Sequence, residues 1–506
     1  MIDMDVSNEI EQPRNSLINP NEVKKYDQYL KKRKMIKYAI IIGFLILLIV
    51  LIIVIIIVAK SGDSDNKNTE RNKEDNNNKK EDIPTYLNVI KAKYFTEKEN
   101  EKIKIINYNN NDNYDKLNIK LFVNNEEKAF NSEYTFIEPK DYLIEFKFNE
   151  ELKNMSSLFM NINNLKEIDL SGIKTKNVKY MDKLFYKCSN LEKINLNNLD
   201  TYNVESMKSM FEGCTNLKEL YMEHFVTSNT IDTNSMFSNC YNLKKINIDY
   251  FDLTHTEDAT YMFESCQSLE EISLKNDKES SSIKIKSMFT KCYSLKIVNL
   301  NHFEKKNITT IDFMFNECHS LQSIDLSKFD TTQVTSISYL FSNCSSLTSI
   351  DLSKMDFKNV ISMDKVFKNC TSLKSIDLTN FNTDNTRTMT AFFFGCSSLE
   401  SIELNNLLNV SDLSDLFNGC SSLQNVTLSA IQVLSADRLF KECNSLKYID
   451  LSHFNASSIS HAIEKNYFPK DAKDVIIVYN SSIIGLFEKL IPEGWNKVDV
   501  NNITDY

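Results

Sequence analysis

Apolar residues return at a fixed interval over most of this chain. A Cys marks each interval, with a Phe three residues before it and a Leu three residues after it, as Phe341, Cys344 and Leu347 show. Nine successive Cys are 26 residues apart, two shorter copies follow, and an earlier copy has Ile162 in place of Cys. The Cys are Cys188, Cys214, Cys240, Cys266, Cys292, Cys318, Cys344, Cys370, Cys396, Cys420 and Cys443. A period of this length predicts a solenoid of about twelve stacked coils.

One repeat predicts two short elements. Ile350 and Leu352 alternate with polar residues, which indicates a strand with one buried face. Val360, Met363 and Phe367 then follow at spacings typical of one face of a short helix. Each coil is therefore expected to contain a strand and a helix, with the strands of successive coils parallel. One coil cannot bury its apolar face alone, so neighbouring coils must stack.

The repeated phrase is clearest in MFESCQSLEEISL and MFNECHSLQSIDLSKFDTTQV. It resembles the BspA-like surface-protein repeat family, a leucine-rich-repeat type, over residues 152 to about 460. The pattern departs from the family at KNDKESSSIKI, which lacks the aromatic residue of the turn, and in the last two shortened copies. The resemblance implies a cell-surface protein involved in adhesion or partner binding, without a catalytic motif. The expected fold is an α/β solenoid with a leucine-rich-repeat-like parallel sheet and short helices, preceded by a transmembrane helix and a small β domain.

The N-terminal part of the chain predicts a membrane anchor. Basic residues crowd between Lys24 and Lys37, and an uncharged apolar stretch runs from Tyr38 to Ala59. At about 1.5 Å per residue a helix of that length crosses a bilayer, whereas the alternative, a cleaved signal peptide, has a shorter apolar core. The basic flank places the N-terminus in the cytoplasm and the repeats outside the plasma membrane. The expected segments are a cytoplasmic tail (1–37), a transmembrane helix (38–59), a disordered stalk (60–83), a small β domain capping the solenoid (84–150), the solenoid (151–460) and a C-terminal cap (461–506).

Candidate chemistry is sparse. The formal net charge of −10 argues against a nucleic-acid partner. The six His do not cluster, and no phosphate-binding loop or Ser/His/Asp trio can be identified, so we expect no enzyme, no cofactor and no metal site. The eleven Cys allow three interpretations: disulfides, metal ligands or a column of small buried residues. An odd count without a CxxC pair favours the buried column.

The outward side of the predicted strands carries the remaining signal. In the first half, the position five residues after the Cys alternates between Glu and Lys, which fixes the stacking register through opposite charges. In the second half a column of acids, seven residues after the Cys, runs beside a column of serines. The acidic strip is Asp325, Asp351, Asp377 and Glu403, and the serine column is Ser323, Ser349, Ser375 and Ser401. We interpret both as a docking face for a basic partner or Ca²⁺; the alternative is a solvated face without a binding role.

These observations predict a single-pass surface protein whose ectodomain binds an extracellular protein or glycan. A surface-glycan-acting ectoenzyme and a structural coat protein are the alternatives; the first would need paired carboxylates among Glu133, Glu138, Asp141 and Glu145. Export through a glycosylating pathway would place sugar on some of the sequons after the predicted span. The sequons are at Asn154, Asn307, Asn409, Asn425, Asn455, Asn480 and Asn502.

Overall fold

The computed structural model divides the chain into two compact units, residues 1–83 and 84–506, and describes only parts of the second. The described residues are 86–107, 118–222, 225–248, 251–274, 283–300, 308–327, 329–378, 381–455, 467–469 and 471–502. The predicted tail, transmembrane helix and stalk lie outside them. Among the residues that are described, no helix combines the length and the apolar character that a membrane span requires.

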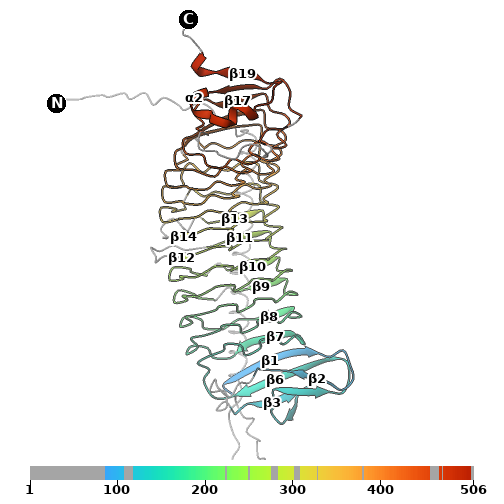
Figure 1. The fold of residues 1–506 in the computed structure, drawn as a ribbon. Coiled ribbons are helices and arrows are strands. Elements are labelled where there is room, and N and C mark those ends of the chain that lie inside the picture. Colours follow the sequence, from blue (N-terminus) through green and yellow to red (C-terminus); the bar gives the residue numbers. More distant parts are fainter. Residues whose placement is uncertain are drawn as a thin grey trace, which may run out of the picture. The chain divides into compact units, whose positions relative to one another are not determined.

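The repeats form a β-solenoid in which successive coils stack with one parallel strand each. Figure 1 shows these strands following one another along the stack. Pairing in register places equivalent residues of neighbouring coils side by side, such as Glu219 beside Lys245 and Glu271 beside Ile297. The strands on this side are β7 (Leu165–Gly172), β8 (Lys193–Asn195), β9 (Glu219–Tyr221), β10 (Lys245–Asn247), β11 (Glu271–Ser273), β13 (Ile297–Asn299), β15 (Ser401–Leu407), β16 (Asn425–Ala430) and β17 (Tyr448–Leu451).

A second set of parallel contacts runs along the other side of the stack. It consists of isolated bridges, such as Tyr180 with Ser206 and Ser336 with Ser362. The short strands β12 (Ile283–Lys284) and β14 (Ile308–Thr310) belong to this side and pair with each other. Each coil is thus fixed to its neighbours at two places.

The predicted short helix of each coil is wrong, and with it the expectation of an α/β solenoid. Lys183 and Phe185 donate their N–H groups to the carbonyls of Lys208 and Met210 in the next coil, at 2.8 Å each. Tyr186 instead donates back to Lys183 at 3.1 Å. An α-helix needs every N–H to reach the carbonyl four residues earlier. Here alternate N–H groups leave the coil, so the segment forms consecutive turns.

Left-handed backbone residues maintain these turns. In each coil the residue before the Cys and the residue four positions earlier have positive φ, for example Lys187 at 56° and Lys183 at 54°. Gly213, Gly395 and Gly419 occupy the position before the Cys with φ of 76°, 72° and 80°, a region that suits glycine. Among the described residues the helical segments are all C-terminal: α2 (Ser481–Ile484), η4 (Gly485–Leu490) and η5 (Val500–Asn502).

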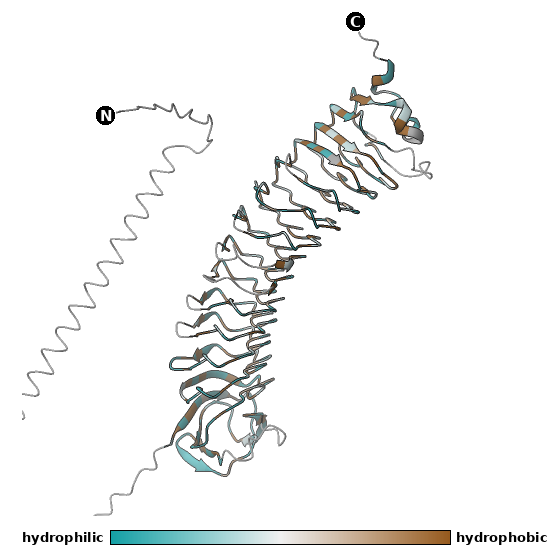
Figure 2. Ribbon diagram, turned by 90° about the vertical axis from the view of Figure 1, so that its left-hand side faces the viewer, coloured by the Kyte–Doolittle hydropathy of each residue, from teal (hydrophilic) through white to brown (hydrophobic). Residues whose placement is uncertain are grey.

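The core consists of columns of identical side chains. The Phe rings stack continuously from Phe159 to Phe440, with centroids 5.2–5.9 Å apart, and Phe468 extends the stack beyond the last Cys. All eleven Cys are buried and free, which confirms the buried column and not the disulfides. Each thiol donates to the carbonyl of a Phe in the preceding coil, as Cys292 does to Phe263 at 3.1 Å. Hydropathy follows the same pattern, with brown and teal bands alternating along the strands near the C-terminus in Figure 2.

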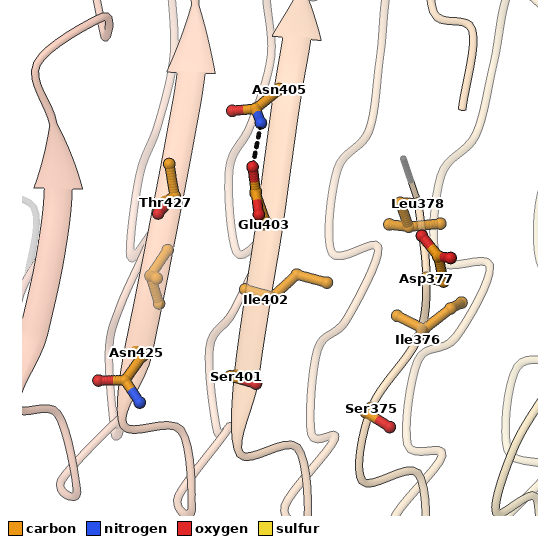
Figure 3. A pocket seen from close by; sticks show the side chains of 11 residues that line it. Ser375, Ile376, Asp377, Leu378, Ser401, Ile402, Glu403, Asn405, Asn425 and Thr427 are labelled. Atoms are coloured by element: carbon orange, nitrogen blue, oxygen red, sulfur yellow. Dashed lines mark hydrogen bonds between the residues drawn. The ribbon is translucent and has the colours of Figure 1, made fainter. Parts of the chain in front are cut away.

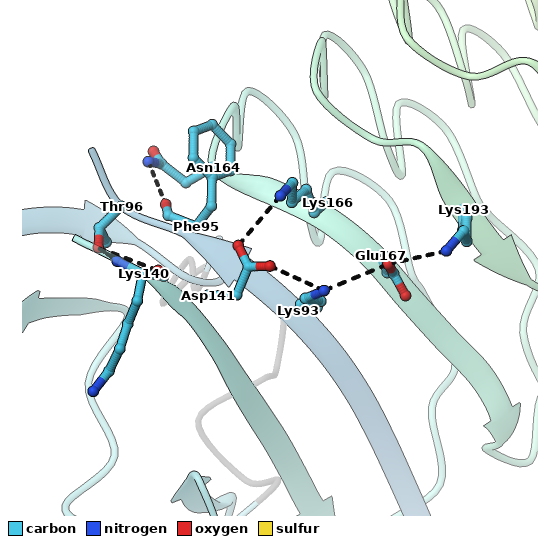
Figure 4. Close-up of polar contacts among 9 residues, drawn as sticks. All are labelled: Lys93, Phe95, Thr96, Lys140, Asp141, Asn164, Lys166, Glu167 and Lys193. Carbon is cyan, nitrogen blue, oxygen red and sulfur yellow. Dashed lines mark hydrogen bonds and ion pairs between the residues drawn. The ribbon is translucent and has the colours of Figure 1, made fainter. Parts of the chain in front are cut away.

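Antiparallel strands adjoin the first coil. The strands β1 (Asn88–Phe95), β3 (Lys120–Val123), β4 (Glu126–Lys128) and β6 (Asp141–Phe148) share one sheet with β7 and β8, in the order β4-β3-β6-β1-β7-β8. The strands β2 (Glu101–Lys104) and β5 (Glu133–Phe136) form a separate two-stranded sheet. Strand β1 pairs antiparallel with both β6 and β7, so it occupies the hydrogen-bonding edge of the first coil. Across this junction Lys93 bridges Asp141 at 3.0 Å and Glu167 at 3.7 Å, as Figure 4 shows. The ammonium of Lys93 lowers the pKa of the Asp141 carboxyl through this contact.

The C-terminal end continues the solenoid sheet. Strands β18 (Ile476–Tyr479) and β19 (Asn496–Asp499) add parallel to β17, giving the order β15-β16-β17-β18-β19. Trp495 packs edge-on against Phe468 at 5.0 Å and donates its indole N–H to the carbonyl of Ala472. The chain after the last Cys therefore covers the end of the Phe stack with an aromatic side chain.

Candidate functional site

The outward side of the strand sheet, here called the strand face, differs between its two halves. In the first half, ion pairs join successive coils, such as Lys193 with Glu167 at 3.3 Å and Lys245 with Glu219 at 3.6 Å. These are the cross-strand pairs that the Glu and Lys alternation predicts. Because both lysine side chains are largely exposed and both glutamates partly so, solvent screens these pairs and each contributes on the order of 0–1 kcal/mol. This half is therefore a surface of largely balanced charge.

The acidic strip occupies the second half of the strand face. All four acids and all four members of the serine column are exposed. Equivalent positions in stacked parallel strands are about 4.8 Å apart, so the strip places like charges at the separation that destabilises a sheet. Among the described residues, no group of three or more His, Cys, Asp or Glu side chains could hold a metal ion. This finding does not support the Ca²⁺ interpretation of the strip.

Part of the strip has a local structural role that the sequence analysis missed. The Asp325 carboxylate accepts the N–H of Ser327, and the Asp351 carboxylate accepts the N–H of Ser353, at 2.9 Å each. Asn195 accepts from Asn197 in the same way, so either Asp or Asn can close the turn after the strand. The hydrogen bond from Ser353 lowers the pKa of Asp351 despite the opposing effect of the neighbouring Asp377 carboxylate. The Asp351 carboxyl therefore stays ionised at neutral pH and its negative charge persists.

Strand pairing is interrupted where the acids stack. Between β13 and β15 the described residues form no strand on this side, although backbone bonds such as Thr348 N–H to Gln322 O, 3.1 Å, keep the coils stacked. β15 is an edge strand of its five-stranded sheet, because it pairs with β16 alone. Residues 375–378 run beside β15, and the residues just before these two segments are bonded, from Glu400 N–H to Lys374 O at 3.1 Å.

A hollow of about 510 Å³ lies at this interruption. Figure 3 shows it opening on the strand face, with Asp377 on one coil and Glu403 on the next. Its lining combines polar side chains with core-type residues. The lining residues are Ser375, Ile376, Asp377, Leu378, Ser401, Ile402, Glu403, Asn405, Asn425, Val426 and Thr427. The hollow thus places one half-buried apolar side chain, that of Ile376, beside two of the acids.

The predicted sequons occupy varied surroundings. Asn425 and Asn502 are exposed, Asn425 at the rim of the hollow. The described sequons with half-buried Asn are Asn154, Asn409, Asn455 and Asn480. Asn307 lies outside the described residues. Glycosylation of these sites stays a prediction, and sugar on Asn425 would obstruct the hollow.

Two family matches cover the repeats. Residues 149–277 and 283–406 match the family described as "Mycoplasma protein of unknown function, DUF285". Residues 361–473 match the "BspA type Leucine rich repeat region (6 copies)". The second match confirms the resemblance inferred from the repeated phrase, and neither match indicates a catalytic family. No curated protein matches the chain.

Solved structures that resemble the chain include bacterial leucine-rich repeat proteins. One from Bacteroides ovatus is 19% identical, with 70% of this chain and 89% of that chain covered and a TM-score of 0.38. One from Eubacterium ventriosum is 17% identical, with coverages of 67% and 91% and a TM-score of 0.25. At these scores the likenesses carry no functional conclusion.

Proposed function

The chain belongs to the DUF285 family, whose model matches half of it, and its repeats are of the BspA leucine-rich type. We propose that its solenoid binds extracellular partners at the cell surface. In this proposal the apolar stretch 38–59 anchors a single-pass protein in the plasma membrane. The basic tail is cytoplasmic and the repeats face outward. Leucine-rich repeat proteins generally act as scaffolds that bind proteins or other ligands. The part that would bind here is the strand face.

The acidic strip is the observation that carries this proposal. Four adjacent coils each present an exposed carboxylate at the same position, although Asn closes the same turn elsewhere, as Asn195 does. Asn would satisfy the backbone without the repulsion. Retention of the acids therefore favours a partner with a basic surface, whose positive charge offsets that repulsion.

The geometry does not favour the ectoenzyme alternative. Each acid that would have to supply its carboxylate pair is bound to a lysine instead: Glu133 to Lys102 at 2.6 Å, and Glu145 to Lys147 at 2.8 Å. Glu138 is held by Lys140 in the same way. Carboxylates neutralised in this manner do not form the pair that glycoside hydrolysis needs. The proposal therefore treats the protein as a binding protein and not as an enzyme.

Neutralising the strip should weaken attachment without unfolding the protein. In cells that display the full chain, we expect the combined changes Asp325→Asn, Asp351→Asn, Asp377→Asn and Glu403→Gln to reduce attachment to cells or matrix. The reduction should be about tenfold at low ionic strength and smaller at high salt, where charges are screened. Thermal unfolding should be unchanged or slightly higher, because the Asn side chains keep the turn and remove repulsion.

A matched variant separates the strip from net charge. Asp356, Asp384, Glu442 and Asp471 are exposed and lie outside the strip; changing these to the corresponding amides removes the same formal charge. This control should attach like the parent. Protease added to intact cells should remove the repeats and spare the basic tail, which verifies that the repeats lie outside the cell. Equal attachment of the strip variant and the parent at low salt would contradict the proposal, as would protection of the repeats from protease.

A further inference from the structure

The hollow beside β15 has a partly exposed aliphatic side chain in its wall. Ile376 is half-buried, as Ile194 and Ile246 are at the same position of the repeat, whereas Ile402 in the next coil is 5% exposed. Leu378 is 8% exposed, against 1% for its equivalent Leu404. An apolar group inserted into the hollow would cover the exposed part of Ile376.

The chemistry around the opening is amphipathic. Ile376 and Ile402 form its apolar wall, and Asp377 and Glu403 stand at the same opening on adjacent coils. None of the lining residues is basic or aromatic. A basic group would complement the acids, and the lack of aromatic rings disfavours stacking of a sugar or a nucleic-acid base.

We propose that this hollow binds an extended segment of a partner protein in which a large aliphatic residue adjoins a lysine or arginine. The aliphatic side chain enters between the two coils and contacts Ile376 and Ile402. The neighbouring cationic side chain remains at the opening and pairs with Asp377 and Glu403. Neighbouring side chains of an extended segment point to opposite sides, so lysines next to the inserted residue begin on the solvent side. Their long flexible chains bend back to the rim of the hollow, and one lysine on each side provides a cation for each acid. This inference rests on the proposed function and specifies the partner chemistry of the strand face.

A defined peptide tests the proposal on the purified full-length chain. The probe is a short blocked fluorescent peptide with the core Lys-Leu-Lys between glycines. Matched probes carry Glu-Leu-Glu, which reverses the charge, or Lys-Ser-Lys, which removes the aliphatic group. Anisotropy titrations should show saturable binding of the first probe and at least about tenfold weaker binding of each of the other two.

Paired variants locate the binding. Asp377→Asn with Glu403→Gln should weaken binding of the Lys-Leu-Lys probe about tenfold, the loss expected for two charge-assisted contacts partly screened by solvent. Asp325→Asn with Asp351→Asn removes the same charge from the same column but leaves the hollow intact. This control should weaken binding clearly less than the first pair does, because its acids lie one and two coils from Asp377 and attract the probe only through longer-range, partly screened charge.

Each outcome decides the inference. Absence of binding, equal binding of the Glu-Leu-Glu or Lys-Ser-Lys probe, or equal weakening by the two variant pairs would overturn it. These results are distinguishable from failure of the proposed function. A chain that binds the probe at the hollow but attaches normally after neutralisation of the strip retains the peptide site and loses the adhesive role. A chain that loses attachment after neutralisation of the strip, and whose parent does not bind the probe, retains the adhesive role and lacks the peptide site.

Discussion

We expect the solenoid to unfold steeply when the pH is raised from about 9 to about 10.5, because its buried thiols resist ionisation. Burial raises the pKa of Cys188, Cys240 and Cys420 to about 12, and it moves the pKa of the other Cys thiols in the same direction. A thiol in the unfolded chain ionises near pH 8.5. Above that pH the unfolded state releases protons that the folded state still holds. The stabilisation is therefore complete below about pH 8.5 and is lost as the pH rises toward 12.

The number of thiols makes the effect large. One thiol contributes a slope of about 1.4 kcal/mol per pH unit in this window. Eleven thiols together give a slope on the order of 15 kcal/mol per pH unit. The free energy of unfolding of a typical domain is only about 5–15 kcal/mol, so one to two pH units above the unfolded-state pKa should suffice. Circular dichroism in urea at a series of pH values, under reducing conditions, measures the slope.

A variant with fewer thiols provides the control. Cys292→Ala, Cys318→Ala and Cys344→Ala together should reduce the slope by about a quarter, since three of the eleven thiols are removed. The comparison uses slopes because the smaller Ala side chains also lower stability at every pH. An unchanged slope, or a parent protein that keeps its full stability to about pH 11, would show that the thiols are accessible or already ionised in the folded state.

The period of the sequence was enough to predict the stacked coils and their core. Equivalent residues of a solenoid must lie side by side once the coils stack, which is why the Phe ring stack and the buried Cys follow directly from the 26-residue spacing. The ion pairs of the first half were predictable for the same reason, because Glu167 and Lys193 are one period apart. The acidic strip was predicted to face outward and its members are exposed; its binding role stays a prediction.

Apolar spacing could not distinguish a short helix from the consecutive turns that each repeat forms, because both place apolar residues at similar intervals. The decisive difference is where the backbone N–H groups go: that of Lys183 bonds to the next coil. One signal was available in the sequence. Asn239, Asn343 and Asn369 precede their Cys at positive φ, where three other coils have Gly. Gly and Asn recurring at one position favour the left-handed region, which a regular helix excludes.

The hollow depends on a property that one repeat does not contain. Ile376, Leu378 and Ile402 are aliphatic like their equivalents in other coils, so the sequence predicts the same packing at every coil. The opening arises where residues 375–378 fail to pair with β15. Repulsion along the acidic strip and the change from the Glu and Lys column to serines are consistent physical causes. Both columns are visible in the sequence, but their effect on strand pairing is not.

Replacing Phe289 by Ala should lower the free energy of unfolding by about 3–5 kcal/mol, the usual cost of removing a buried Phe. Phe289 is fully buried in the middle of the stack, with ring centroids 5.6 Å from both Phe263 and Phe315. Loss of its ring leaves a cavity flanked by two aromatic faces. The surrounding backbone is held on both sides, because Phe289 N–H bonds to Met314 O and Phe289 O accepts the Cys318 thiol. The coil therefore cannot collapse to fill the space.

The position of the cavity predicts where the damage appears. Each coil of a solenoid contacts only its neighbours, so the loss weakens the two interfaces of that coil and the unfolding can become stepwise. Hydrogen exchange should accelerate first at inter-coil N–H groups near the cavity, such as Phe263 and Phe289, and last at Phe185. Tyr202→Ala is the control, since that ring is 55% exposed and its loss should cost less than about 1 kcal/mol. Uniform acceleration along the whole stack would contradict nearest-neighbour coupling, and a cost for Phe289→Ala no larger than that for Tyr202→Ala would show that the ring stack does not hold the coils together.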